Sequence, residues 1–102
     1  MLFLVKAKNT ADSAELRSAN IPAHVDYLDR YKERFIAGGP VLSDDGEHVT
    51  GTMMVLDMPS RKALDDFLAD EPYNKAGLFE KIEITRWRFG KADVNRKDIV
   101  LS

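Results

Sequence analysis

The sequence predicts an α+β domain with the element order βαββαβ. Three observations support this class: apolar runs of strand length near residues 2–5, 50–58 and 78–89, helical spacing of apolar residues over 12–35 and 60–71, and a hairpin signal at 43–46. This order is the ferredoxin-like arrangement, in which both helices cover one face of a four-stranded antiparallel sheet. The chain's 102 residues allow a single domain.

The domain is expected to span residues 1–90, and residues 91–102 form a tail that is either disordered or an added edge strand. Residues 2–5 are apolar at successive positions, which is typical of a strand buried on both faces. Asp12 and Ser13 are helix-starting residues. We expect this helix to restart at Asn20, a good cap that places Pro22 in the first turn.

The second half of this helical stretch carries one apolar line that begins with a histidine. The line consists of His24, Leu28, Tyr31 and Phe35, spaced four, three and four residues apart, with charged residues on the other faces. This face is therefore expected to point inward.

A short edge strand is predicted next, because Gly38, Gly39 and Pro40 interrupt an apolar run and proline cannot donate to a central ladder. The Asp-Gly step in residues 43–46 favours a hairpin. Its partner strand is expected over residues 50–58, again apolar on both faces.

The second helix is predicted to open at Pro59 and Ser60 and to end over residues 70–73. Its apolar face consists of Leu64, Phe67 and Leu68. A last strand starts near Leu78. Its apolar residues switch parity between Ile82, Ile84 and Trp87, Phe89, which predicts a bulge near Thr85.

Composition argues against several classes of function. A net charge of −2 without clustered Lys and Arg disfavours nucleic acid as a partner. The chain has no cysteine, its two histidines lie in separate segments, and no glycine-rich phosphate loop precedes a helix, so we expect neither a metal nor a nucleotide cofactor. Neither a signal peptide nor an apolar run of bilayer length is found, and a cytoplasmic protein without membrane contact is expected.

The first and third strands are apolar on both faces, whereas helices cover only one face of the predicted sheet. A bare face of this kind would exceed the apolar patches of typical monomers. We therefore expect a homodimer or larger homo-oligomer whose sheets pack face to face and enclose clefts. The alternatives are a lid formed by the tail or a different partner.

Several motifs together resemble the YCII-related (YciI-like) family of dimeric α+β barrel proteins. The resemblance extends to about Phe89 and rests on the following residues, in this order: "MLFLVKA" at the start, Arg17, "PAH" at 22–24 with Tyr27-Leu28, "AGGP" at 37–40, "DG" at 45–46, "GT" at 51–52 and "EPYNKAGLFE" at 71–80. It implies a ferredoxin-like subunit, a dimeric or larger assembly, and an active site around a histidine and an acid. Some members are thought to act on ring compounds by lyase-like or hydrolytic chemistry.

The chain departs from the family pattern at three positions. Ile21 stands where the family often has an arginine, Glu71-Pro72 replaces an Asp-Pro, and Thr52 replaces a serine while keeping the hydroxyl. The acid that partners His24 is therefore either Glu71 or the preceding Asp70.

The leading hypothesis is a small cofactor-independent enzyme in which His24 is the general acid or base, oriented by Glu71 or Asp70. The predicted substrate-binding residues are Arg17, Gly39, Pro40, Thr52 and Tyr73. The alternatives are a core histidine at 24, a surface ion pair of Arg17 with Glu15 or Asp12, and a bulged edge strand at the glycines. At the level of function, the alternative is a non-catalytic module that binds or senses a small molecule, or a purely structural role for the sheet contact.

Overall fold

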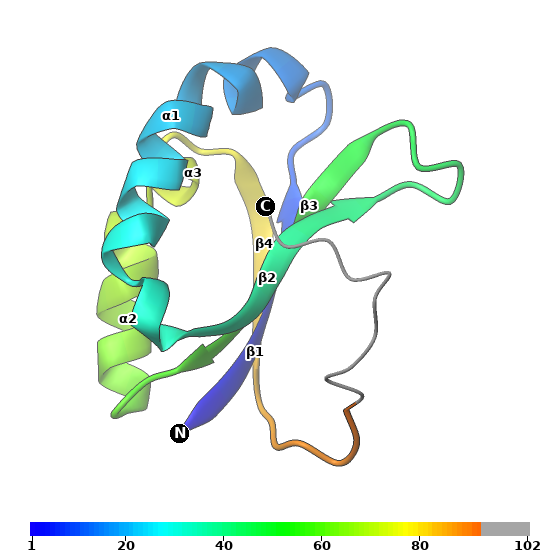
Figure 1. Ribbon diagram of the computed structural model, residues 1–102. Coiled ribbons are helices and arrows are strands. Elements are labelled where there is room, and N and C mark those ends of the chain that lie inside the picture. Colours follow the sequence, from blue (N-terminus) through cyan, green and yellow to red (C-terminus); the bar gives the residue numbers. More distant parts are fainter. Residues whose placement is uncertain (93–102) are drawn as a thin grey trace.

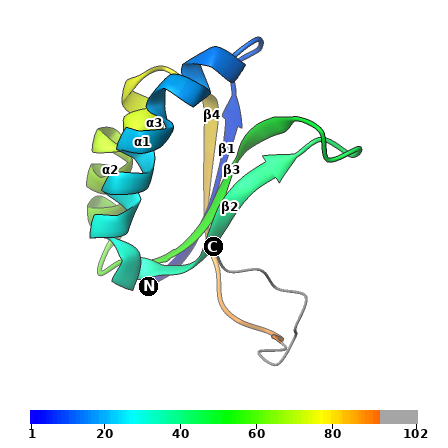
Figure 2. The ribbon, with the colours of Figure 1, turned by 45° about the horizontal axis from the view of Figure 1, so that its top comes forward.

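The computed structural model describes residues 1–92, which form one four-stranded antiparallel sheet with helices on one face. Figures 1 and 2 show the helices along one side of the sheet and the opposite side free of them. The predicted ferredoxin-like βαββαβ class is confirmed. The elements are β1 (Leu2–Asn9), α1 (Ala14–Arg30), a 3-10 turn η1 (Lys32–Arg34), β2 (Phe35–Leu42), β3 (Val49–Asp57), α2 (Arg61–Asp70), α3 (Pro72–Lys75) and β4 (Phe79–Arg86).

The strand order is β2-β3-β1-β4, which places β2 at an edge, as predicted from its proline. The strand runs through the Gly-Gly-Pro break without ending, and Pro40 lies opposite Thr52 of β3. The hairpin between them turns at Gly46, whose φ of 74° is a conformation that glycine adopts readily. The predicted tail lies outside the described residues from 93 on.

The first helix is one piece, so the predicted restart at Asn20 is wrong. Asn20 donates its side-chain amide back to the Leu16 carbonyl at 2.8 Å and therefore caps no new helix. Pro22 lies inside α1 on an exposed side, where water can bond the carbonyl that loses its N–H partner. The predicted line Leu28, Tyr31 and Phe35 does pack against the core, but the helix ends before its last two members, because Tyr31 is the C-cap and Phe35 begins β2.

The last strand contains no bulge near Thr85, so that prediction is also wrong. The pairing of β4 with β1 is continuous from Arg86 opposite Phe3 to Lys81 opposite Lys8, and the register shifts only beyond Lys8. The strand ends at Arg86, so Trp87 and Phe89, whose parity suggested the bulge, lie beyond it. Side chains there no longer alternate between the two faces of the sheet.

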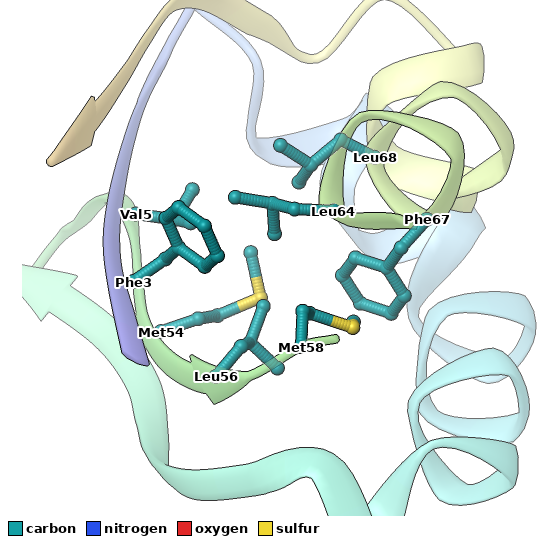
Figure 3. Packing of buried hydrophobic residues seen from close by; sticks show 8 residues of the cluster. All are labelled: Phe3, Val5, Met54, Leu56, Met58, Leu64, Phe67 and Leu68. Atoms are coloured by element: carbon teal, nitrogen blue, oxygen red, sulfur yellow. The ribbon is translucent and has the colours of Figure 1, made fainter. Parts of the chain in front are cut away.

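The core lies between the sheet and α2, as Figure 3 shows. It is built from alternate residues of β1 and β3 and from the predicted apolar face of α2. Its members are Phe3, Val5, Met54, Leu56, Met58, Leu64, Phe67 and Leu68. The N-terminus of α2 is fixed by the side chain of Ser60, which accepts a hydrogen bond from the Ala63 N–H at 3.0 Å.

The other long helix, α1, has no fully buried residue and touches this core only through half-buried side chains. It therefore stands over the β2 side of the sheet without sealing it, which leaves room for the cleft described below. Within residues 1–92, no helix combines the length and apolar character that a membrane span requires.

Candidate functional site

The central feature of the site is a contact between His24 of α1 and Glu71 at the junction of α2 and α3. The imidazole Nδ1 lies 2.5 Å from the carboxylate Oε1. The Glu71 side chain is 0% exposed and that of His24 is 12% exposed, so this pair is shielded from bulk water. The structure thus selects Glu71 between the two predicted acids, whereas Asp70 is exposed and makes no hydrogen bond with His24.

Glu71 is held in place by the local sequence. It ends α2 with its backbone N–H on the Leu68 carbonyl, and it begins α3, where Pro72 occupies the first turn. The second carboxylate oxygen accepts a hydrogen bond from the Asn74 N–H at 3.1 Å. Both oxygens of this buried carboxylate therefore have partners, as a buried charge requires.

The histidine is fixed on a second side by the phenol ring of Tyr73. The two rings are stacked, with centroids 3.8 Å apart and planes 9° from parallel. Burial raises the pKa of the Tyr73 phenol, so this residue stays neutral at physiological pH. A carboxylate that accepts the Nδ1 proton leaves Nε2 as the nitrogen able to exchange a proton with a ligand.

His24 lines a cleft of about 480 Å³ between α1 and the β2-β3 part of the sheet. Its walls include six of the eight predicted site residues: Arg17, His24, Gly39, Pro40, Thr52 and Tyr73. Glu71 lies behind the histidine, and Asp70 is not part of the wall. Sequence reasoning did not place Ile21, Val25, Leu28, Asp29, Lys32, Phe35 and Met54 in the wall of a cleft.

Arg17 lines the same cleft as His24. It is half-buried and, within residues 1–92, forms no ion pair with Glu15, Asp12 or any other carboxylate. Its charge acts on the Tyr73 phenol, opposing the rise in the pKa of that group. Arg17 thus lines the cleft without a carboxylate partner among residues 1–92, so the predicted alternative of a surface ion pair is not seen there.

His48 is exposed in the hairpin loop, away from the cleft. Residues 1–92 contain no group of three or more His, Cys, Asp or Glu side chains that could hold a metal ion.

Residues 1–88 match the model of the YCII-related domain. The chain belongs to the YCII-related family. The Protein YciI chains of Escherichia coli and Shigella flexneri are each 28% identical to it over 91 residues, covering 82% of this chain and 93% of theirs.

Among solved structures, this YCII-related chain is similar to the 5-chloro-2-hydroxyhydroquinone dehydrochlorinase TftG from Burkholderia phenoliruptrix, in complex with 2,5-dihydroxybenzoquinone. The identity is 33%, the TM-score is 0.82, and the match covers 88% of this chain and 96% of that one. An antibiotic biosynthesis monooxygenase matches at a TM-score of 0.52 and 11% identity, covering 89% of this chain and all of its own, and shares the fold alone. The resemblance noted in the sequence is confirmed.

Proposed function

We propose that this protein is a small cofactor-independent enzyme of the lyase type, in which His24 moves a proton on a hydroxylated ring. The observation that carries the proposal is the imidazole held through Nδ1 by a fully buried carboxylate at the wall of a cleft. An imidazole oriented in this way is suited to general acid and base catalysis near neutral pH. The similarity to a dehydrochlorinase that acts on a hydroquinone supports the choice of substrate class.

The proposed reaction is the elimination of an acid from a halogenated polyhydroxylated ring. The Nε2 atom of His24 accepts a hydroxyl proton, and the imidazolium returns a proton to the ring carbon that bears the halogen. The halide then leaves with its bonding electrons while a second hydroxyl loses its proton. The ring reaches the quinone level by the net loss of one proton and one halide, so no external oxidant is consumed.

The other cleft residues have separate roles in this scheme. Arg17 binds the ring oxygen that becomes negative when its proton leaves. The Thr52 hydroxyl makes no side-chain hydrogen bond with the described residues and is available to a second ring oxygen. Gly39 and Pro40 form a wall of backbone along one side, and Tyr73 keeps the imidazole plane fixed.

The test is turnover of 5-chloro-2-hydroxyhydroquinone, followed by chloride release and by the absorbance of the quinone. His24→Ala should lower kcat by about 10²- to 10⁴-fold, the usual contribution of general acid-base catalysis. His48→Ala is the matched control, since this histidine is exposed and lies outside the cleft. Unchanged turnover in His24→Ala would refute the mechanism, and ring binding without turnover in the wild type would favour a non-catalytic binding module.

We also propose that the protein functions as a homodimer through the sheet face that carries no helix. This face presents Leu4, Met53 and Val55 around the centre of the sheet, where β1 and β3 pair. Met53 is 37% exposed in the single chain. A second copy packed on this face would remove Met53 and the half-buried Leu4 from water, beside Val55, which is already buried.

A further inference from the structure

The cleft runs lengthwise along α1. Its lining residues on this helix recur at the spacing of a single helical face and are Arg17, Ile21, His24, Val25, Leu28 and Asp29. From Arg17 to Asp29 the helix rises by about 18 Å, at 1.5 Å per residue. The cleft is therefore elongated, not a compact hole around the histidine.

The wall of the cleft that faces α1 is formed in part by β2, which runs along the same axis. After α1 the chain turns through η1 into β2, so β2 begins beneath the C-terminal end of α1 and runs back toward its N-terminal half (Figures 1 and 2). Phe35 consequently lies at one end of the cleft and Pro40, paired with Thr52, lies at the other.

Polar groups gather toward one end of this axis, with one apolar residue, Ile21, between Arg17 and His24 on α1. The end near Pro40 carries Arg17, His24 and Thr52, which we call the polar end. The other end, which we call the apolar end, is formed by Leu28, Phe35, Gly38 and Met54. Beyond it, the exposed Asp29 and Lys32 stand at the rim.

The volume exceeds the needs of a single ring. A cavity of about 150 Å³ is enough to hold benzene, whereas this cleft measures about 480 Å³. The polar end accounts for a hydroxylated ring beside His24 and Arg17. The apolar end remains to be filled, and water would gain few hydrogen bonds against Leu28, Phe35 and Met54.

We infer that the ligand of this protein is a hydroxylated ring that carries an apolar substituent, with the ring at the polar end and the substituent between Leu28 and the Phe35–Met54 wall. This inference rests on the proposed function for the identity of the ring and extends it by a second part of the substrate. At Gly38 an added Cβ would come within 3.2 Å of the Phe35 ring, so the glycine leaves room for that ring in the wall of the apolar end.

The experiment is a binding series, measured by titration calorimetry with the purified full chain. The probes are 2,5-dihydroxybenzoquinone and its 3-methyl, 3-propyl and 3-pentyl derivatives. We expect Kd to fall with each added methylene by up to about fourfold, the value for full burial of a CH₂ group. A Kd that stays level or rises along the series overturns the inference.

A matched pair of variants locates the substituent. Val25 lines the cleft and is 57% exposed, so Val25→Glu adds a charge beside the apolar end without filling the core. Leu16 is 37% exposed on the same helix and lies outside the cleft, which makes Leu16→Glu the control for an added helix charge. The gain with chain length should vanish in Val25→Glu and persist in Leu16→Glu. A gain that persists in both variants places the substituent elsewhere and overturns the assignment.

The outcomes separate this inference from the proposed function. If the parent ring binds and the alkyl chains add nothing, the substituent is excluded and the proposed function stands. If the chains improve binding but 5-chloro-2-hydroxyhydroquinone is not turned over, the elimination chemistry fails and the inference stands. If no member of the series binds, both are refuted.

Discussion

The buried pair of His24 and Glu71 predicts an unusual order of stabilities among its variants. In His24→Ala the carboxylate of Glu71, which is 0% exposed in the wild type, loses the partner of its Oε1 atom. In the double variant His24→Ala/Glu71→Gln a neutral amide occupies the same place, and its oxygen can still accept the Asn74 N–H that caps α3. The double variant should therefore be more stable than the single one.

The magnitudes follow from the burial of the pair. Removing one member of a buried charged pair costs about 3–5 kcal/mol, because the other charge is left unpaired. Loss of the ring stacking on Tyr73 adds about 1 kcal/mol in both variants. Glu71→Gln alone exchanges a charged hydrogen bond for a neutral one, at a cost of about 1 kcal/mol. The double variant is spared the unpaired charge, so we expect a coupling energy of about 3 kcal/mol.

The measurement is urea unfolding of the wild type, both single variants and the double variant, with the free energy of unfolding extrapolated to water. The four proteins form a double-mutant cycle, in which independent sites would add within about 0.5 kcal/mol. Additive losses would show that Glu71 carries no uncompensated charge when the histidine is absent. The electrostatic description of the pair would then be wrong.

Three further predictions test other parts of the molecule. Gly51→Ala should lower the free energy of unfolding by at least about 1–3 kcal/mol, because the added Cβ would lie 2.2 Å from the Ala7 carbonyl oxygen. Gly39→Ala is the control, since a Cβ there meets nothing within 4 Å. Equal urea midpoints for the two variants would contradict the packing. Burial raises the pKa of the Tyr27 phenol, so above about pH 10 the folded state keeps a proton that the unfolded chain releases, and the contribution of this group to stability is constant below about pH 10 and is lost above it. Tyr27→Phe should therefore lessen the alkaline fall in the melting temperature, and an unchanged pH profile would exclude the group. Met53→Glu places a charge on the sheet face without helices and should shift the protein from dimer to monomer in sedimentation velocity, whereas a wild type that is already monomeric at micromolar concentration would refute the proposed assembly.

The sequence was sufficient to predict the four strands of residues 1–92, because three apolar runs have strand length and the edge strand follows from the Gly-Gly-Pro break before the hairpin signal. It also identified His24 and the acidic pair that contains Glu71, although that identification depended on the family resemblance. The choice between Glu71 and Asp70 required the structure, since both end the same helix. It is decided by α3, whose start at Glu71 turns that side chain inward while Asp70 stays on the exposed side of α2.

The errors have local physical causes. The short helix α3 was missed although an acceptor at Glu71 followed by Pro72 is a helix-starting pattern, because both residues were interpreted only as the end of α2. Asn20 has the composition of a cap, but its amide bonds within the helix instead. The apolar wall residues Ile21 and Val25 were missed because they lie on the flank of the line that begins at His24, and only the position of β2 shows that this flank faces a cleft.

The position of Glu71 links the stability of the fold to the chemistry proposed for the site. The same side chain caps α3 through one oxygen and orients His24 through the other, while its backbone ends α2. A shift of α3 would therefore move the carboxylate and the stacked Tyr73 together, and with them the plane of the imidazole. A general base requires this kind of fixed orientation, because its efficiency depends on the direction from which it meets the proton. In this small domain the acid that orients the base is thus set by a helix junction and not by a loop, and changes at the junction should affect kcat and stability together.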